Sequence, residues 1–85
     1  KGDIRVMDIL RLLDRIIENH GGETTCGQVQ IYSHNILYEV EDVMGNVITC
    51  DIKNNIYEIK HPNGAINRAF TLDDFSLILH ALYSN

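Results

Sequence analysis

Residues 33–45, with the sequence SHNILYEVEDVMG, decide the fold of this chain because they fit two kinds of secondary structure. As a strand over 36–43, they alternate between apolar and polar side chains and end at a turn over 44–46. As a helix, they begin at Ser33 as the N-cap and end at Gly45, with the apolar side chains on one stripe. The segments on either side of them favour the strand.

The chain after Glu23 consists of short apolar segments separated by turn residues at nearly regular intervals. This rhythm is typical of an antiparallel meander, in which each strand is joined to the next by a hairpin. None of the segments has a proline in its interior, where a paired strand excludes it. The expected strands cover residues 26–32, 36–43, 47–52, 56–61 and 65–70.

Helices are expected at both ends of the chain. In the first, over 3–20 or 8–20, apolar residues recur at spacings of three and four, and Gly21-Gly22 supplies a helix end. Thr71 is expected to cap the second, with Asp74 as its capping-box partner. The order of helix, five strands and helix predicts an α+β domain with both helices on one face of the sheet.

The helical interpretation of 33–45 leads to a different fold. With a helix at 35–44 and a short helix through 28–32, the order of elements resembles that of a winged helix-turn-helix. No motif supports this resemblance beyond the order of elements. It implies a DNA-binding regulator, and this function is the alternative to the one expected below.

The length and charge of the chain limit its partners. The 85 residues are expected to form one domain, 1–85, in which 1–6 are interpreted as an added segment before Met7. Seven Lys and Arg against twelve Asp and Glu give a net charge of -5. This charge repels phosphate backbones and anionic membranes, so we expect a protein partner with a basic surface and no nucleic acid or membrane.

The cysteine content favours the cytoplasm. Cys26 and Cys50 are too few for a disulfide framework, and neither has the neighbouring ligands of a zinc site. We expect two free thiols in a reducing compartment, because the sequence also has no signal-peptide pattern and no apolar run of about 20 residues. No phosphate-binding glycine loop or metal-ligand spacing is present, so no metal or other cofactor is expected.

The turns predict which side chains lie beside one another. A three-residue loop over 44–46 places Glu39 opposite Asp51, and a two-residue loop over 54–55 places Asp51 opposite Glu58. Alternate residues share a face, and the inward-facing set is expected to be Tyr38, Val40, Ile48, Cys50, Ile52, Tyr57 and Ile59.

The predicted register aligns Glu39, Asp51 and Glu58 on the exposed face, with Glu41 one step along and Lys60 as the nearby cation. Like charges directly opposite one another destabilise a sheet, so folding alone does not explain such a row. One interpretation is a surface that binds a basic protein partner. The other is a solvated acidic face that keeps a small sheet soluble.

No catalytic residues are expected. Cys50 and His61 both face inward in the predicted sheet, but a thiol in the middle of an apolar strand is commonly inert packing. We therefore expect a non-enzymatic interaction module, an inhibitor or accessory factor of the kind that phages and mobile elements often carry. Met7 and Leu12 widen the apolar stripe of the first helix, which is compatible with a homodimer.

Overall fold

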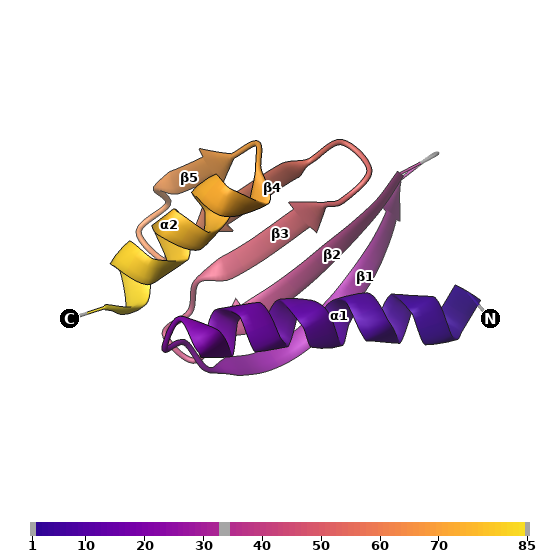
Figure 1. The fold of residues 1–85 in the computed structure, drawn as a ribbon, viewed down its shortest axis with the longest axis horizontal. Coiled ribbons are helices and arrows are strands. Elements are labelled where there is room, and N and C mark those ends of the chain that lie inside the picture. Colours follow the sequence, from indigo (N-terminus) through magenta and orange to yellow (C-terminus); the bar gives the residue numbers. More distant parts are fainter. Residues whose placement is uncertain (1, 33–34, 85) are drawn as a thin grey trace.

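The computed structural model describes residues 2–32 and 35–84. Its five strands form one antiparallel sheet in sequence order, and both helices lie on the same face of that sheet (Figure 1). The predicted α+β meander is confirmed. The elements are α1 (Gly2–Asn19), β1 (Thr24–Tyr32), β2 (Asn35–Asp42), β3 (Val47–Asp51), β4 (Ile56–Lys60), β5 (Ile66–Ala69) and α2 (Leu72–Tyr83).

β2 occupies the segment whose sequence fits both a strand and a helix. It pairs with β1 on one side and with β3 on the other, and its burial alternates along the strand. The helical interpretation is therefore wrong, and the winged-helix alternative loses its recognition helix. Two flanking strands need β2 as their hydrogen-bonding partner, and its aliphatic and aromatic side chains fit the centre of a sheet.

The core lies between the inner face of the sheet and the two helices. α1 packs on β1 and β2, while α2 packs on β5 (Figure 1). The ring of Phe75 stacks on Tyr57 with the ring centroids 5.0 Å apart. The buried apolar residues are Leu13, Ile17, Tyr38, Val40, Ile48, Cys50, Tyr57, Ile59, Ala69, Phe75 and Leu79. Of the predicted inward-facing set only Ile52 is missing, because it lies in the turn after β3.

The predicted end of the first helix and the predicted cap of the second are confirmed, but α1 begins at Gly2, so Asp3 and Asp8 lie within it and neither is its N-cap. The Thr71 hydroxyl accepts a hydrogen bond from the Asp74 backbone N–H at 3.1 Å, which caps α2. After α1, Gly21 adopts a positive φ of 95°, and the N–H of Gly22 donates to the carbonyl of Ile17 at 3.0 Å. This left-handed glycine ends α1 and turns the chain towards β1.

The register differs from the prediction by two residues at both hairpins. Glu39 lies opposite Thr49 instead of Asp51, and Glu58 also lies opposite Thr49. Because the shift is even, every side chain that remains in β2, β3 or β4 stays on its predicted face.

Both shifts come from the side chain of an aspartate. The first loop has three residues as predicted, but it covers 43–45, with Gly45 at a positive φ in the last position. Asp42 accepts the backbone N–H groups of Met44 and Asn46 at 2.9 and 2.7 Å and so fixes this turn. At the second hairpin Asp51 accepts the N–H of Asn54 at 3.2 Å, and the loop widens to four residues.

Candidate functional site

The candidate site lies on the outer face of the sheet, which we define as the face opposite α1 and α2. All four carboxylates that the sequence singled out, Glu39, Glu41, Asp51 and Glu58, belong to strand positions on this face. The prediction of a common face is therefore confirmed for them. Because both helices pack on the other side, this face carries no covering layer from either helix (Figure 1).

The four carboxylates do not stand opposite one another. Thr49 separates Glu39 from Glu58, while Asp51 lies opposite Ile56 and Glu41 lies opposite Val47. The predicted row of Glu39, Asp51 and Glu58 is wrong, since the two-residue shift at both hairpins places Thr49, and not Asp51, opposite Glu39 and Glu58. The cost of opposed like charges, which argued for a function, is thus absent from the outer face.

Two of the carboxylates are held by cross-strand partners. Glu39 accepts hydrogen bonds from the side-chain amides of Gln28 at 2.7 Å and Gln30 at 2.9 Å. Glu58 accepts one from Nε of Arg68 at 2.6 Å, which is also an ion pair. Sequence reasoning named Lys60 as the nearby cation and missed Arg68, because it did not extend the register to β5.

Asp51 is held by amides at the end of β3. Its carboxylate accepts hydrogen bonds from the side chains of Asn35 at 2.7 Å and Asn54 at 2.9 Å. The bond from the Asn54 side chain is the main influence that lowers the pKa of Asp51, and it outweighs burial, which raises that pKa. The Oδ1 atom of Asn35 is itself buried and has no hydrogen-bond partner.

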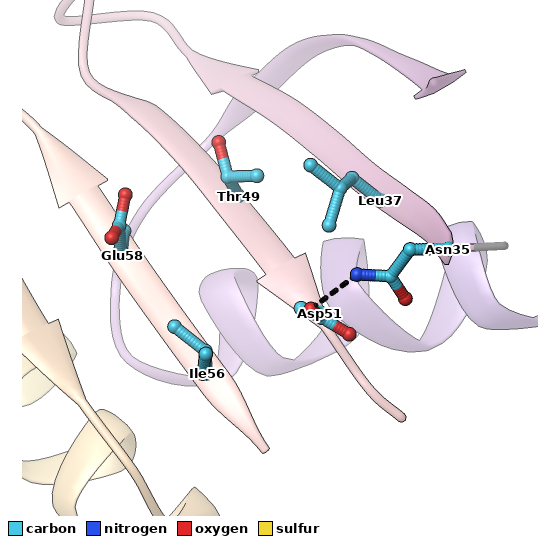
Figure 2. Close-up of a pocket in the computed structure, with 6 residues that line it drawn as sticks. All are labelled: Asn35, Leu37, Thr49, Asp51, Ile56 and Glu58. Atoms are coloured by element: carbon cyan, nitrogen blue, oxygen red, sulfur yellow. Dashed lines mark hydrogen bonds between the residues drawn. The ribbon is translucent and has the colours of Figure 1, made fainter. Parts of the chain in front are cut away.

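A hollow of about 220 Å³ lies between three strands of the outer face. Its lining residues are Asn35, Leu37, Thr49, Asp51, Ile56 and Glu58. Figure 2 shows these side chains rising from β2, β3 and β4 on the same side, with α1 behind the sheet. Leu37 and Ile56 supply apolar walls, Thr49 is the small residue between them, and Asp51 and Glu58 bring carboxylates. A long aliphatic side chain with a cationic end suits such a lining.

Cys50 and His61 are not joined as a nucleophile and base. Burial raises the pKa of the Cys50 thiol to about 12, so the thiolate is scarce at neutral pH. His61 uses Nδ1 in a 2.9 Å hydrogen bond with Asn46 and Nε2 in a 2.8 Å hydrogen bond with Asn67. Both ring nitrogens are thereby engaged with amides. That the protein is not an enzyme stays a prediction.

Asp42 is a buried polar residue that the sequence analysis missed. It is 1% exposed on the helix-facing side of the sheet, where its carboxylate also accepts the side-chain amide of Asn46 at 2.7 Å. The Tyr83 hydroxyl donates to the same carboxylate at 2.5 Å. Burial, followed by this carboxylate, raises the pKa of Tyr83 above its usual range. The contact ties the end of α2 to the β2–β3 turn, which is a structural role.

Neither described helix is long and apolar enough to cross a membrane. Among the side chains that the structure describes, over 8–31 and 35–84, no three of His, Cys, Asp or Glu are grouped closely enough to hold a metal ion. Comparisons of the chain with protein-family models, with curated proteins and with solved structures find no match.

Proposed function

We propose that the protein is a non-enzymatic interaction module that binds a basic protein surface through the outer face of its sheet. In this role it acts as an inhibitor or accessory factor in the cytoplasm. The observation that supports the proposal is the hollow on the outer face, where apolar walls and two carboxylates lie together outside the helix layer. The two unbridged cysteines fit a reducing compartment.

In this proposal an arginine or lysine side chain of the partner enters the hollow. Its methylene groups pack between Leu37 and Ile56, and its cationic head lies beside the carboxylate of Glu58 or Asp51. Burying a methylene group stabilises binding by about 0.8 kcal/mol, whereas an exposed ion pair contributes about 0–1 kcal/mol. The walls therefore contribute as much to the affinity as the charges do, and the charges select a cation over a neutral side chain.

The four carboxylates have different roles in this proposal. Glu39 and Asp51 each accept at least two hydrogen bonds from neighbouring amides, so they set the negative potential of the face. Glu58 lines the hollow and already has a cation beside it, the guanidinium of Arg68. Glu41 is exposed, and it attracts the partner at long range.

The proposal is tested with a tripeptide, acetyl-Ala-Arg-Ala-amide, titrated into the protein and followed by backbone amide chemical shifts. The matched control is the same peptide with neutral citrulline in place of arginine. We expect weak, millimolar binding with shift changes centred on Leu37, Thr49 and Ile56, and smaller changes with citrulline. Equal responses to the two peptides, or changes centred on α2, would overturn the proposal.

A pair of variants separates the hollow from general charge attraction. Thr49→Leu fills the hollow without changing the net charge, and Thr49→Val keeps nearly the volume of threonine. We expect Thr49→Leu to remove the response to the arginine peptide and Thr49→Val to keep it. If both variants bind as the native chain does, the carboxylates alone attract the peptide and the hollow has no role.

A further inference from the structure

The two edges of the sheet are protected to different degrees. β5 has four residues and includes Arg68, and α2 packs on its face as α1 packs on the face of β1. β1 has nine residues, TTCGQVQIY, without a charged residue or a proline. Natural sheets usually block their edges with short strands, charges, prolines or a covering element, because an open edge pairs with other chains. Besides α1 on its inner face, β1 has a bulge between Thr24 and Cys26 at its beginning, and its hydrogen-bonding edge carries no charge or proline.

The outer edge of β1 is open. It hydrogen-bonds with β2 on one side, and no strand in the described part of the chain pairs with its other side. Most of its residues are exposed, and Ile31 is 75% exposed. The strand therefore presents a long row of backbone N–H and C=O groups to a further strand.

We propose that this edge pairs with a second copy of itself, β1 antiparallel to β1 of the partner, so that two sheets become one of ten strands. The proposal does not rest on the binding of a basic partner. In a pair centred on the middle of the strand, near Gly27 and Gln28, uncharged side chains meet uncharged side chains. Such pairing meets no opposed like charges, although each chain has a net charge of -5.

A strand from a basic partner fits the β1 edge less well. The nearest outer-face carboxylates of the neighbouring strand are Glu39 and Glu41, one strand further in. Glu39 accepts hydrogen bonds from Gln28 and Gln30, so these amides rather than a carboxylate adjoin the edge. An uncharged strand is thus the better match, and β1 of a second copy is the uncharged strand that the chain itself provides.

The helix layer supports the same pairing. α1 lies over β1 and β2 (Figure 1), so its axis is about one strand spacing from the two-fold axis of the pair. Two strand spacings of about 4.8 Å place the two α1 helices about 10 Å apart where they cross the edge, and helices pack at about 8–10 Å. Leu10 reaches over the edge strand at Gly27, where a Cβ atom would lie 3.4 Å from its Cδ2 atom. The two Leu10 side chains meet near the axis.

The mass of the protein and one distance test the pairing. Sedimentation equilibrium at rising concentration is expected to show twice the 9.7 kDa of one chain. Cys26 is exposed and Cys50 is buried, so a nitroxide spin label attaches to Cys26 alone. We expect the two labels at about 1–2.5 nm, because Cys26 lies near the centre of the paired strands. Pairing through β5 would separate them by nine strand spacings, or about 4 nm.

Two isoleucines provide a matched pair of variants. Ile31 lies in β1 and Ile66 lies in β5, and both are exposed, at 75% and 52%. Ile31→Lys places a charge on the open edge, and we expect the dimer dissociation constant to rise at least about 10-fold. Ile66→Lys makes the same change on the other edge and is expected to leave that constant unaltered. Gln28→Lys, at the exposed centre of β1, repeats the test if Ile31→Lys fails to fold.

Several results would overturn the pairing. A chain that stays monomeric at millimolar concentration has no such interface. A label distance near 4 nm, or a dimer lost in Ile66→Lys and kept in Ile31→Lys, places the contact on another edge. A monomer whose β1 amides respond to the arginine peptide shows that a basic partner, and not a second copy, adds the strand. Added salt should strengthen self-association, because it screens the repulsion between two acidic chains.

Discussion

The β2–β3 turn and the β3–β4 turn each begin with an aspartate that ends its strand. Asp42 and Asp51 both accept a backbone N–H from their turn and a side-chain amide from an asparagine. They differ in what lies behind them, because Asp42 faces α2 and Asp51 faces the uncovered side of the sheet. The same local device is thus part of the core in one turn and part of the candidate binding face in the other.

This difference predicts unequal costs when each carboxylate is removed. Asp42 is 1% exposed and accepts four hydrogen bonds, including that of Tyr83, which belongs to α2. Asp51 is 7% exposed and its partners come from the strand ends and from its own turn. Loss of Asp42 therefore disturbs two elements, and loss of Asp51 disturbs mainly one.

The largest effect is expected for Asp42→Ala. The change leaves the buried donors of Asn46 and the partly buried donors of Met44 and Tyr83 without their acceptor, and each buried unsatisfied donor costs about 1–3 kcal/mol. We expect the free energy of unfolding to fall by about 3–5 kcal/mol, as measured by urea denaturation followed by circular dichroism. A fall below about 1 kcal/mol would show that water replaces the carboxylate and that the turn is not part of the core.

Tyr83→Phe is the control for the link to α2. It removes one donor and keeps the turn, so we expect a smaller loss of about 1–2 kcal/mol. A loss equal to that of Asp42→Ala would mean that the contact with α2, and not the turn, provides the stability. Hydrogen exchange of the α2 amides separates the two cases, because only loss of the α2 contact releases that helix alone.

A smaller and pH-dependent effect is expected for Asp51→Asn. The hydrogen bonds from Asn54 and Asn35 hold the pKa of Asp51 below its usual value of 3.8. A lowered folded-state pKa contributes stability above that usual value, and this contribution is lost as the pH falls through the folded-state pKa. The difference in unfolding free energy between the native chain and Asp51→Asn should be constant above about pH 5 and shrink below about pH 4.

Urea midpoints measured at several pH values check this expectation. Glu58→Gln is the matched control, because it also removes a carboxylate from the outer face. Glu58 is held by an ion pair with Arg68 and not by asparagine side chains. A difference between Asp51→Asn and the native chain that stays constant down to pH 2 would contradict a lowered pKa. It would also remove Asp51 as a fixed charge of the hollow at acidic pH.

The two turns also show how far the sequence predicts the structure. Polarity and spacing predicted every strand and both helices, because the pattern of apolar residues depends on which face is buried. Register depends on where each turn begins. Asp42 and Asp51 accept hydrogen bonds from their own turns, and the strand pairing at each hairpin differs from the predicted pairing by two residues. Gly45 could have indicated the correct start of the first turn, because a three-residue loop commonly places glycine at its last position. In the four-residue loop after Asp51 the last position is Asn55 at a positive φ of 53°, and asparagine there signals a turn but not the length of the loop.

The candidate site was predictable in its face and unpredictable in its contacts. Alternation placed Glu39, Asp51 and Glu58 on one side of the sheet in both the predicted and the observed register, because each hairpin shifted by an even number of residues. Which side chains meet depends on the register across three strands, and there an error of two residues exchanges Thr49 for Asp51. The contact between Arg68 and Glu58 additionally required the pairing of β5.

The smallest effect is expected for the ion pair between Arg68 and Glu58. The two side chains are 54% and 33% exposed, so solvent screens their attraction. A double-mutant cycle with Arg68→Gln and Glu58→Gln should give a coupling free energy of about 0.2–1 kcal/mol that decreases in 1 M salt. A coupling above about 2 kcal/mol would show that the outer face is as rigidly held as the helix-facing side. Glu58 could then exchange Arg68 for a partner's cation only at a considerable cost, and the arginine peptide should bind more tightly to Arg68→Gln than to the native chain.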